Sequence, residues 1–304
     1  MTTASASKQV LLQRLEGSHQ IPPIPVVLAP LLRYLQQPVC PPNDEQIDVQ
    51  RFTDLLAQDK VLAAQCLQMA NSPLCGQWQK VDSLRGAVVS LGFHHVSDIA
   101  MSCGVLNLLP GKRTTLDPVV FWEHSLGCAL ICRHLARKIH FGDPGKAYLA
   151  GLLHDIGIIV NLWVIPNEFR AAFDVARAEG IPLGQAEQEC LGFTHCDSGL
   201  ALAERWGLSS DLIEVVTHHH APEGSHNHSS LVALVQLADL LCRMGGLNYG
   251  YIEKRQVSVT EEYGFGVLAQ HYPTIKGFDW ARLTFELDSY LDEVHNLVRT
   301  IYRT

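Results

Sequence analysis

The feature of this sequence that most constrains its fold is a nearly all-apolar stretch, residues 147–160, which carries His154 and Asp155 side by side in its middle. A helix that is apolar on every face is normally buried. An ionised carboxylate buried without a partner costs several kcal/mol, so Asp155 requires an arginine, a hydrogen-bond network or a metal ion. Adjacent histidine and aspartate suit a cation, because both side chains can reach one point from the same helical turn. Since most such pairs are ordinary structure, the rest of the chain has to decide between these partners.

The composition argues against several classes of protein. Of the 304 residues, 47% are hydrophobic and 18% are charged, which is typical of a globular chain with one large or two modest domains. The net charge of −8 argues against a nucleic-acid groove, because phosphate binding requires clustered lysine and arginine. The nine cysteines lack CxxC spacing and indicate small core residues of a reducing compartment. A polar N-terminus and the lack of an apolar run of membrane-spanning length predict a cytoplasmic protein without a membrane partner.

Apolar residues at three- and four-residue spacing, with serine, proline and glycine at the expected helix ends, predict an all-α fold. Predicted caps are Ser83, Thr194 in a capping box with Asp197, and Ser229 or Ser230. We expect an N-terminal extension over residues 1–19, one helical sub-bundle over 20–115 and a second over 116–246. The C-terminal segment, 247–304, is expected to be less regular up to residue 278, with room for a small extended segment, and to end in a long amphipathic helix packed on the core. The apolar stripe of that helix is Leu283, Leu287, Leu291, Val294, Val298 and Ile301. The predicted helices are 8–16, 25–35, 49–58, 61–69, 84–91, 96–108, 118–139, 147–160, 167–179, 195–205, 210–220, 231–244 and 280–302.

A second acidic residue, Asp239, lies in an equally apolar stretch, and several histidines occupy helix centres or ends in the same half of the chain. His195 is in the first turn of its helix, where unpaired N–H groups favour an anion such as phosphate. One or two metal centres would satisfy these buried groups together. Nitrogen and oxygen ligands suit iron, manganese, zinc, nickel or magnesium, and the many histidines favour transition metal, one or two ions per chain. The predicted metal ligands are His124, His154, Asp155, His195, His219, His220 and Asp239.

Each of these residues also has an ordinary structural interpretation. A single buried histidine is more often a core residue hydrogen-bonded to a carbonyl than a ligand. Cys128 and Cys132, on the same face as His124, are more often small core residues. The order and spacing of the seven residues therefore matter more than any one of them. The remaining histidines of interest are predicted to face solvent or away from the site: His94, His95, His134, His218, His226 and His228.

The order His … His-Asp … His … His-His … Asp resembles that of the HD superfamily of metal-dependent phosphohydrolases, in the variant found in HD-GYP cyclic-dinucleotide phosphodiesterases. Other segments resemble the HDOD family, the HD-related output domain of bacterial signalling proteins. The resemblance covers roughly residues 20–245 and implies an HD-like second sub-bundle, a metal site and a role in signalling. The segments are Ile21-Pro-Pro-Ile-Pro, Gln58-Asp59, Leu67-Gln-Met-Ala-Asn71-Ser72-Pro, Ser83-Leu-Arg-Gly-Ala-Val-Val-Ser-Leu-Gly92, Gly192-Phe-Thr-His195, Arg205-Trp-Gly207-Leu and His219-His220-Ala-Pro222.

Two departures from the HD-GYP pattern bear on function. The Gly-Tyr-Pro segment is missing after His220, and an apolar stretch, residues 157–159, replaces the lysine that faces the substrate phosphate in those enzymes. Arg243 is the basic residue nearest in sequence to a predicted ligand, so we expect His195 and Arg243 to contact a bound ligand.

Two functions therefore remain open. One is an HDOD-type signalling module that binds a phosphate-like or nucleotide ligand or a signalling protein. The other is a metal-dependent phosphohydrolase acting on a nucleotide or cyclic dinucleotide, in which Asp155 is catalytic because it bridges the metals.

Overall fold

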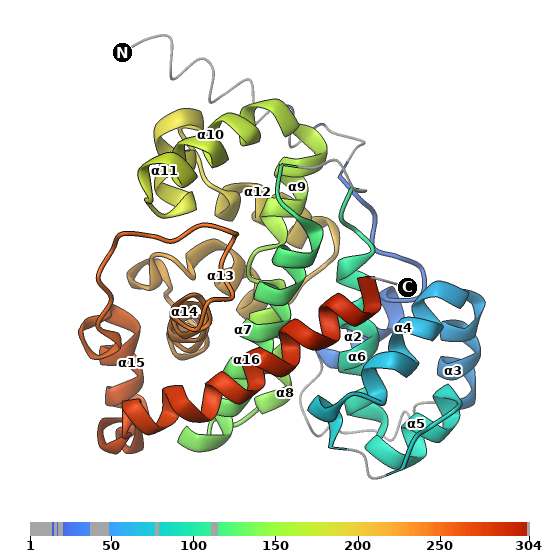
Figure 1. The fold of residues 1–304 in the computed structure, drawn as a ribbon. Helices are drawn as coiled ribbons and strands as arrows, with labels where there is room; N and C mark the ends of the chain where they lie inside the picture. The colour runs from blue at the N-terminus through green and yellow to red at the C-terminus, as the bar shows by residue number, and fades with distance from the viewer. Residues whose placement is uncertain are drawn as a thin grey trace.

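The structure is a computed structural model, which describes residues 14, 17, 21–36, 49–76, 79–110 and 115–302. Every regular element within these ranges is helical, so the predicted all-α fold is confirmed (Figure 1). Two helical sub-bundles lie side by side, and the C-terminal helix, α16, contacts both of them (Figure 1). The predicted helix over residues 8–16 lies outside the described ranges except for Arg14.

The first sub-bundle is built around α6, which is buried on every face from residue 96 to its end. Helices α2, α4 and α5 contact α6, and α3 packs on α4 and α5. The side chain of Ser83 caps α5 as predicted, and Asp59 caps α4. The elements are α2 (Ala29–Leu35), α3 (Val49–Gln58), α4 (Lys60–Ala70), η1 (Pro73–Cys75), α5 (Leu84–Leu91) and α6 (Phe93–Leu106).

Gly92 joins α5 to α6 with φ +87° and ψ 156°, a conformation that is essentially restricted to glycine. Gly92→Val is expected to lower the free energy of unfolding by about 1–3 kcal/mol, because valine would be strained there. Thermal unfolding of the purified variant measures this loss. Gly142→Val is the matched control, since Gly142 has no positive φ and open space around its Cβ position. Equal melting temperatures for the two variants would contradict the strain at Gly92.

The second sub-bundle has α7 at its centre, in contact with α8, α14 and α16. Thr194 opens α12 with the predicted capping box, in which Asp197 accepts a hydrogen bond from the Thr194 N–H. The predicted serine cap of α14 is wrong: His228 occupies the cap position, and no side chain caps that helix. The elements are α7 (Pro118–Ile139), α8 (Pro144–Leu153), α9 (Ile156–Val164), α10 (Pro166–Glu179), α11 (Leu183–Leu191), α12 (His195–Arg205), α13 (Ser210–His218), η2 (Pro222–Gly224) and α14 (Ser229–Met244).

The predicted helix over residues 147–160 is wrong in one respect, because it breaks at the His-Asp pair. Helix α8 ends before His154, and α9 begins after Asp155, whose φ of −100° and ψ of 17° interrupt the helix. Gly157, in the first turn of α9, lies so close to α12 that a Cβ would stand 1.8 Å from the carbonyl oxygen of His195. The glycine therefore permits the close approach that brings Asp155 beside His195.

Residues Pro144–Val164 are long and apolar enough to cross a membrane, with a mean hydropathy of 1.5. The expectation that no run reaches this length is therefore wrong. In the folded protein, however, 94% of the apolar window is buried inside the molecule. The position of α8 and α9 in the core accounts for this apolarity.

The segment after α14 is irregular over residues 247–258 and then becomes helical again. No strand forms among the described residues before residue 278, and the stretch after residue 258 is more regular than predicted, because η3 (Val259–Glu261), α15 (Tyr263–His271) and η4 (Pro273–Gly277) follow one another there. Helix α16 (Trp280–Tyr302) has the predicted bounds and packs on α7, while it also contacts α4 and η1. Its predicted apolar stripe is buried: Leu283, Leu287, Leu291, Val294, Val298 and Ile301.

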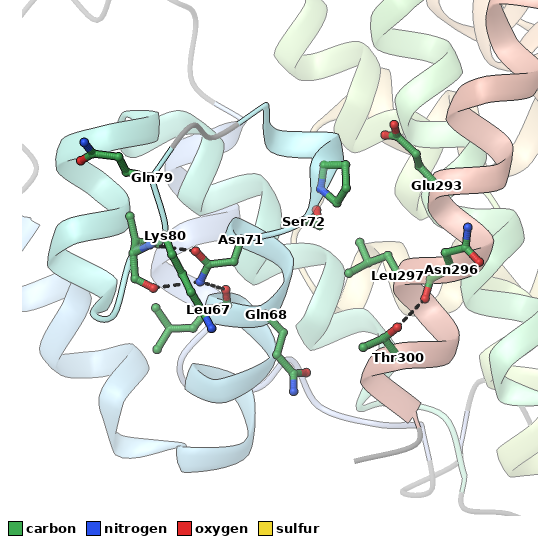
Figure 2. Close-up of a pocket in the computed structure, with 12 residues that line it drawn as sticks. Leu67, Gln68, Asn71, Ser72, Gln79, Lys80, Glu293, Asn296, Leu297 and Thr300 are labelled. Carbon is green, nitrogen blue, oxygen red and sulfur yellow. Dashed lines mark hydrogen bonds between the residues drawn. The ribbon is translucent and has the colours of Figure 1, made fainter.

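A cavity of about 740 Å³ lies between α16 and the first sub-bundle (Figure 2). On one side, Asn71 donates from its amide to the carbonyls of Leu67 and Val81, each at 2.8 Å. On the other side, Asn296 and Thr300 belong to α16 (Figure 2). The Asn71 side chain therefore holds the turn after α4 in place, and its polar groups are already used.

A buried ion pair joins the two sub-bundles. Arg133 of α7 donates to the carboxylate of Asp98 on α6, and its guanidinium carbon lies 3.9 Å from the ring centroid of Tyr148 on α8. The Tyr148 hydroxyl shares a 2.7 Å hydrogen bond with Ser102, also on α6. Burial raises the pKa of Asp98 to about 6, although Arg133 opposes this shift.

Candidate metal centre

Asp155 stands at the centre of a buried cluster of imidazoles. Its Oδ1 lies 3.3 Å from His195 Nε2 and 3.4 Å from His219 Nε2. Its Oδ2 lies 3.0 Å from His154 Nε2 and 3.5 Å from His124 Nε2. One carboxylate therefore faces two pairs of histidines, one pair on each oxygen.

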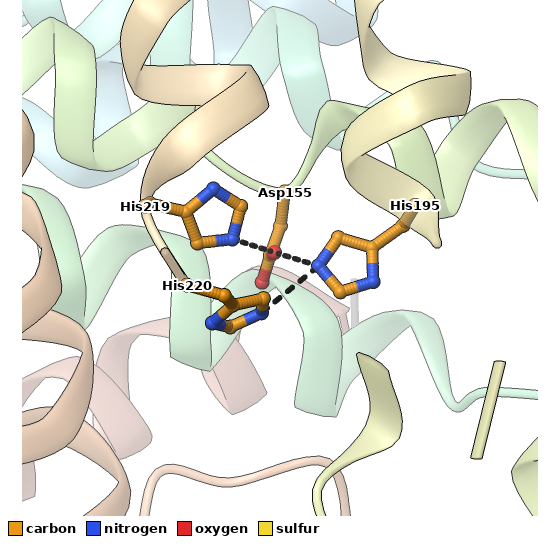
Figure 3. Close-up of side chains that lie close together, drawn as sticks. All are labelled: Asp155, His195, His219 and His220. Atoms are coloured by element: carbon orange, nitrogen blue, oxygen red, sulfur yellow. Dashed lines mark hydrogen bonds and ion pairs between the residues drawn. The ribbon is translucent and has the colours of Figure 1, made fainter. Parts of the chain in front are cut away.

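The cluster contains all seven residues predicted as metal ligands, and they fall into two groups. Within each group, the ligand atoms all lie within 4.8 Å of one another. In one group, His195 Nε2 and His220 Nε2 are 3.1 Å apart (Figure 3). In the other, Asp239 Oδ1 lies 3.3 Å from His124 Nε2. We call the first set group A (Asp155, His195, His219, His220) and the second group B (His124, His154, Asp239).

Segments far apart in the sequence supply these side chains. Because α8 contacts α7, α13 and α14, and α9 contacts α12, helix packing brings these segments together. The break between α8 and α9 is what allows neighbouring residues, His154 and Asp155, to point into the same space. The contributions are His124 from the middle of α7, His154 and Asp155 from the α8–α9 break, His195 from the start of α12, His219 and His220 from just after α13, and Asp239 from α14.

Four of the histidines have a hydrogen-bond acceptor at Nδ1, which places their hydrogen there in the neutral ring and leaves a lone pair on Nε2. All four Nε2 atoms point towards Asp155. Metal-binding histidines show this arrangement, because an acceptor on the far nitrogen orients the ring. The acceptors are Leu247 O for His124 (2.7 Å), Gly151 O for His154 (2.8 Å), Val215 O for His219 (3.0 Å) and Glu187 Oε2 for His195 (2.6 Å).

The spacing of the ligand atoms fits a metal ion. Two ligands about 2.1 Å from one ion lie about 3.0 Å apart along an octahedral edge and about 3.4 Å apart along a tetrahedral edge. The distances from Asp155 to the four Nε2 atoms span 3.0 to 3.5 Å. Among the described residues, Asp155 Oδ1, His219 Nε2 and Asp239 Oδ1 are buried yet have no hydrogen-bond partner. Buried polar atoms without partners are costly, and one cation in each group would satisfy them.

The electrostatics of the cluster also call for positive charge. Burial opposes ionisation of Asp155, but His154, His195 and His219 outweigh it and hold the pKa of Asp155 well below its usual value. Burial likewise lowers the pKa of a histidine, yet Asp155 and Cys128 together override it and raise the pKa of His154 to about 10. The buried carboxylates therefore favour positive charge at their histidine neighbours. Metal cations between the two kinds of side chain would supply that charge.

Glu187 of α11 is a site residue that sequence reasoning missed. It is completely buried and accepts hydrogen bonds from His195 Nδ1, from the His195 backbone N–H at 2.9 Å and from Asn161 at 3.0 Å. A signal was present, since Glu187 lies on the apolar stripe of α11, between Leu183 and Leu191. This carboxylate occupies the helix start at His195, so the backbone N–H expected to bind an anion there is already used.

Tyr249 is the second residue missed, and nothing in the sequence marked it. It lies beyond the segment that resembles HDOD, yet its hydroxyl donates a hydrogen bond to Asp155 Oδ2. Its ring centroid is 4.7 Å from that of His124. A residue of the irregular segment after α14 thus enters the predicted metal site.

An open cavity of about 720 Å³ reaches the cluster, and His220, Arg243, Tyr249 and Arg255 are among its lining residues. Arg243, predicted to contact a ligand, lines this cavity, but both of its amino groups bind carboxylates. They lie 2.7 Å from Asp239 Oδ2 and 2.8 Å from Glu253 Oε1.

Comparisons with known proteins agree with this architecture. The HDOD domain family model matches residues 21–222. The crystal structure of an HDOD domain protein from Geobacter sulfurreducens is 28% identical, with a TM-score of 0.81 over 98% of both chains. A candidate phosphohydrolase from Shewanella amazonensis, 24% identical over 96% of this chain and 97% of its own, has the same fold with a TM-score of 0.70.

Among curated sequences, Ribonuclease Y from Thermus thermophilus is 29% identical over 153 residues, which are 47% of this chain and 21% of the relative. The chain spans less than half the length of the curated relatives it matches. The family match, in contrast, covers most of this chain, and the fold agrees over nearly its whole length. The chain therefore belongs to the HDOD family.

Proposed function

We propose that this protein is a bacterial, cytoplasmic signalling module of the HDOD type whose second sub-bundle holds one or two transition-metal ions that bind a phosphate-containing ligand. The observation that carries the proposal is the position of Asp155, whose two oxygens face the Nε2 atoms of four oriented histidines. Groups A and B would hold the ions, with Asp155 shared between them.

The cavity beside group A supports an external ligand. Its volume of about 720 Å³ lies within the range of small-molecule sites. The His220 side chain is 32% exposed, so group A is the part of the cluster that the cavity reaches directly. A bound ion would supply the positive charge that attracts phosphate oxygens. Arg243 would contribute a further positive charge at the wall, weakened by its two carboxylate partners.

Phosphate binding tests this function. Inorganic phosphate is expected to bind the metal-loaded protein in calorimetry and to lose that binding after chelation or in His195→Ala, because both remove metal from group A. His226→Ala, in the exposed loop before α14, is the matched control and should bind phosphate like the wild type. Phosphate binding that survives chelation would place the anion away from the metal site.

Hydrolysis is the second candidate function, favoured by a carboxylate whose two oxygens face two ligand groups, as in two-metal sites. Turnover also requires groups that orient the ester and neutralise its developing charge. The cavity arginines are already paired, Arg243 with Glu253 and Arg255 with Glu262 at 2.6 Å. We therefore expect turnover of cyclic di-GMP to be absent or very slow with excess manganese or ferrous iron. A rate of about 1 s⁻¹ or more that disappears in Asp155→Ala would establish the enzyme instead.

Glu187→Gln is expected to weaken metal binding by about 10- to 100-fold, because the carboxylate that orients His195 is lost while the shape of the side chain is retained. Competition with a coloured chelator measures the change. Glu189→Gln, on the exposed face of the same helix, is the matched control. Equal affinities in the two variants would show that Glu187 does not support a metal ligand.

A further inference from the structure

The segment over residues 247–254, which we call the strap, crosses the metal centre and is fixed at both ends. At its start, the carbonyl of Leu247 accepts the Nδ1 hydrogen of His124 at 2.7 Å. At its far end, the backbone N–H of Lys254 donates to the carbonyl of Gly180 at 2.8 Å. Between these points, Glu253 accepts from Arg243 at 2.8 Å. The strap is thus tied to α7, to α14 and to the turn after α10.

A turn in the strap aims its two tyrosines at different partners. Gly250 has φ +85°, and its N–H donates to the side chain of Asn248 at 2.9 Å. The Tyr249 hydroxyl is directed at Asp155, whereas the Tyr251 hydroxyl donates to the carbonyl of Ile181 at 3.1 Å. Only the first of these tyrosines enters the cluster, so the second provides a natural comparison.

Tyr249 stands between the cavity and group B. Its hydroxyl contacts Asp155 Oδ2, the oxygen that faces His124 and His154, and its ring lies against His124. The same residue lines the cavity, although it is only 5% exposed. A ligand that reaches group B from the cavity must therefore pass or displace this side chain.

We propose that Tyr249 is an exchangeable metal ligand of group B, which a phosphate-type ligand entering from the cavity has to displace. The proposal rests on the proposed metal site, and it assigns the strap the role of controlling access to it. On coordination to ferric iron, the phenol O–H bond breaks, the proton leaves to solvent through the cavity, and no electron is transferred. When phosphate takes the position, the phenolate oxygen recovers a proton from solvent.

Ferric iron provides a test that does not depend on activity, because a phenolate bound to ferric iron gives a charge-transfer band in the visible range. The iron-loaded wild type is expected to show this band and to lose it as inorganic phosphate is added. Tyr249→Phe keeps the ring that packs on His124, so it should lose the band completely with its iron content unchanged. Tyr251→Phe is the matched control and should keep both the band and the iron.

The outcomes separate this inference from the proposed function. Iron-loaded wild type without a visible band, or a band that remains in Tyr249→Phe, would overturn the role of Tyr249 while leaving the metal site intact. Failure of the wild type to bind iron or any other transition metal would overturn both. Loss of the band in Tyr251→Phe, with iron retained, would also overturn the assignment to Tyr249.

Discussion

Asp155→Ala is expected to abolish metal binding. The loss of metal affinity should exceed about 100-fold, which is the upper end of the loss expected when a residue that only orients a ligand is replaced. The reason is that Asp155 offers one oxygen to each ligand group, so a single substitution removes a ligand from both. Elemental analysis of the purified variant measures the metal, expected at one or two ions per wild-type chain. Chelation should lower the melting temperature of the wild type and leave that of the variant unchanged, because bound metal stabilises only the folded state that binds it.

Two controls sharpen this experiment. Asp174→Ala, at an exposed position of α10, should keep the wild-type metal content. Asp239→Asn removes a carboxylate from group B only, so it should retain the metal of group A. If Asp155→Ala kept the metal content of the wild type, the proposed metal centre would be wrong.

Asp98→Ala is expected to lower the free energy of unfolding by about 3–5 kcal/mol, because it leaves the Arg133 guanidinium buried without its carboxylate. The pair joins α6 to α7, so the loss should weaken the contact between the two sub-bundles. Denaturant unfolding monitored by circular dichroism provides the measurement.

The combined variant Asp98→Ala with Arg133→Met tests whether the unpaired guanidinium of Arg133 causes the loss of stability. Because no charge then remains buried, we expect it to be more stable than Asp98→Ala alone. Arg282→Ala is the surface control, because the Arg282 side chain, which pairs with Glu286, is 77% exposed and the loss of such a pair should have little effect on stability. If Asp98→Ala were no more destabilising than Arg282→Ala, the buried pair would not connect the sub-bundles energetically.

Helix positions were largely predictable, because their signals are local. Apolar spacing with Pro118 at the first position gave the bounds of α7, and Ser83 with Gly92 gave those of α5. The predictions were wrong where a long-range contact overrides the local pattern. The apolar run around Asp155 reads as one helix, yet the close packing of Gly157 on α12 coincides with a break. Helix α11 and the helical turns after residue 258 carried weaker signals and were missed.

The seven predicted ligands could be named from sequence because each is a polar residue in an apolar setting or a histidine at a helix end, and because their order resembles that of HD proteins. The structure brings all seven within one cluster. Glu187 could have been suspected from the sequence, because it is a charged residue on the apolar stripe of α11. Tyr249 had none, since an irregular segment has no period from which to tell which side chain points inward.

The helical class, most helix ends and the residues able to hold a metal follow from the sequence, because capping, apolar spacing and the cost of burying charge are properties of short segments. The tertiary structure sets how those residues meet. It places Asp155 between two pairs of histidines and gives each pair its orienting acceptors. It also pairs Arg243 with two carboxylates and brings the Tyr249 hydroxyl into contact with Asp155. These relations join residues as far apart as His124 and Leu247, and they depend on how whole helices pack, which no local pattern of residues records.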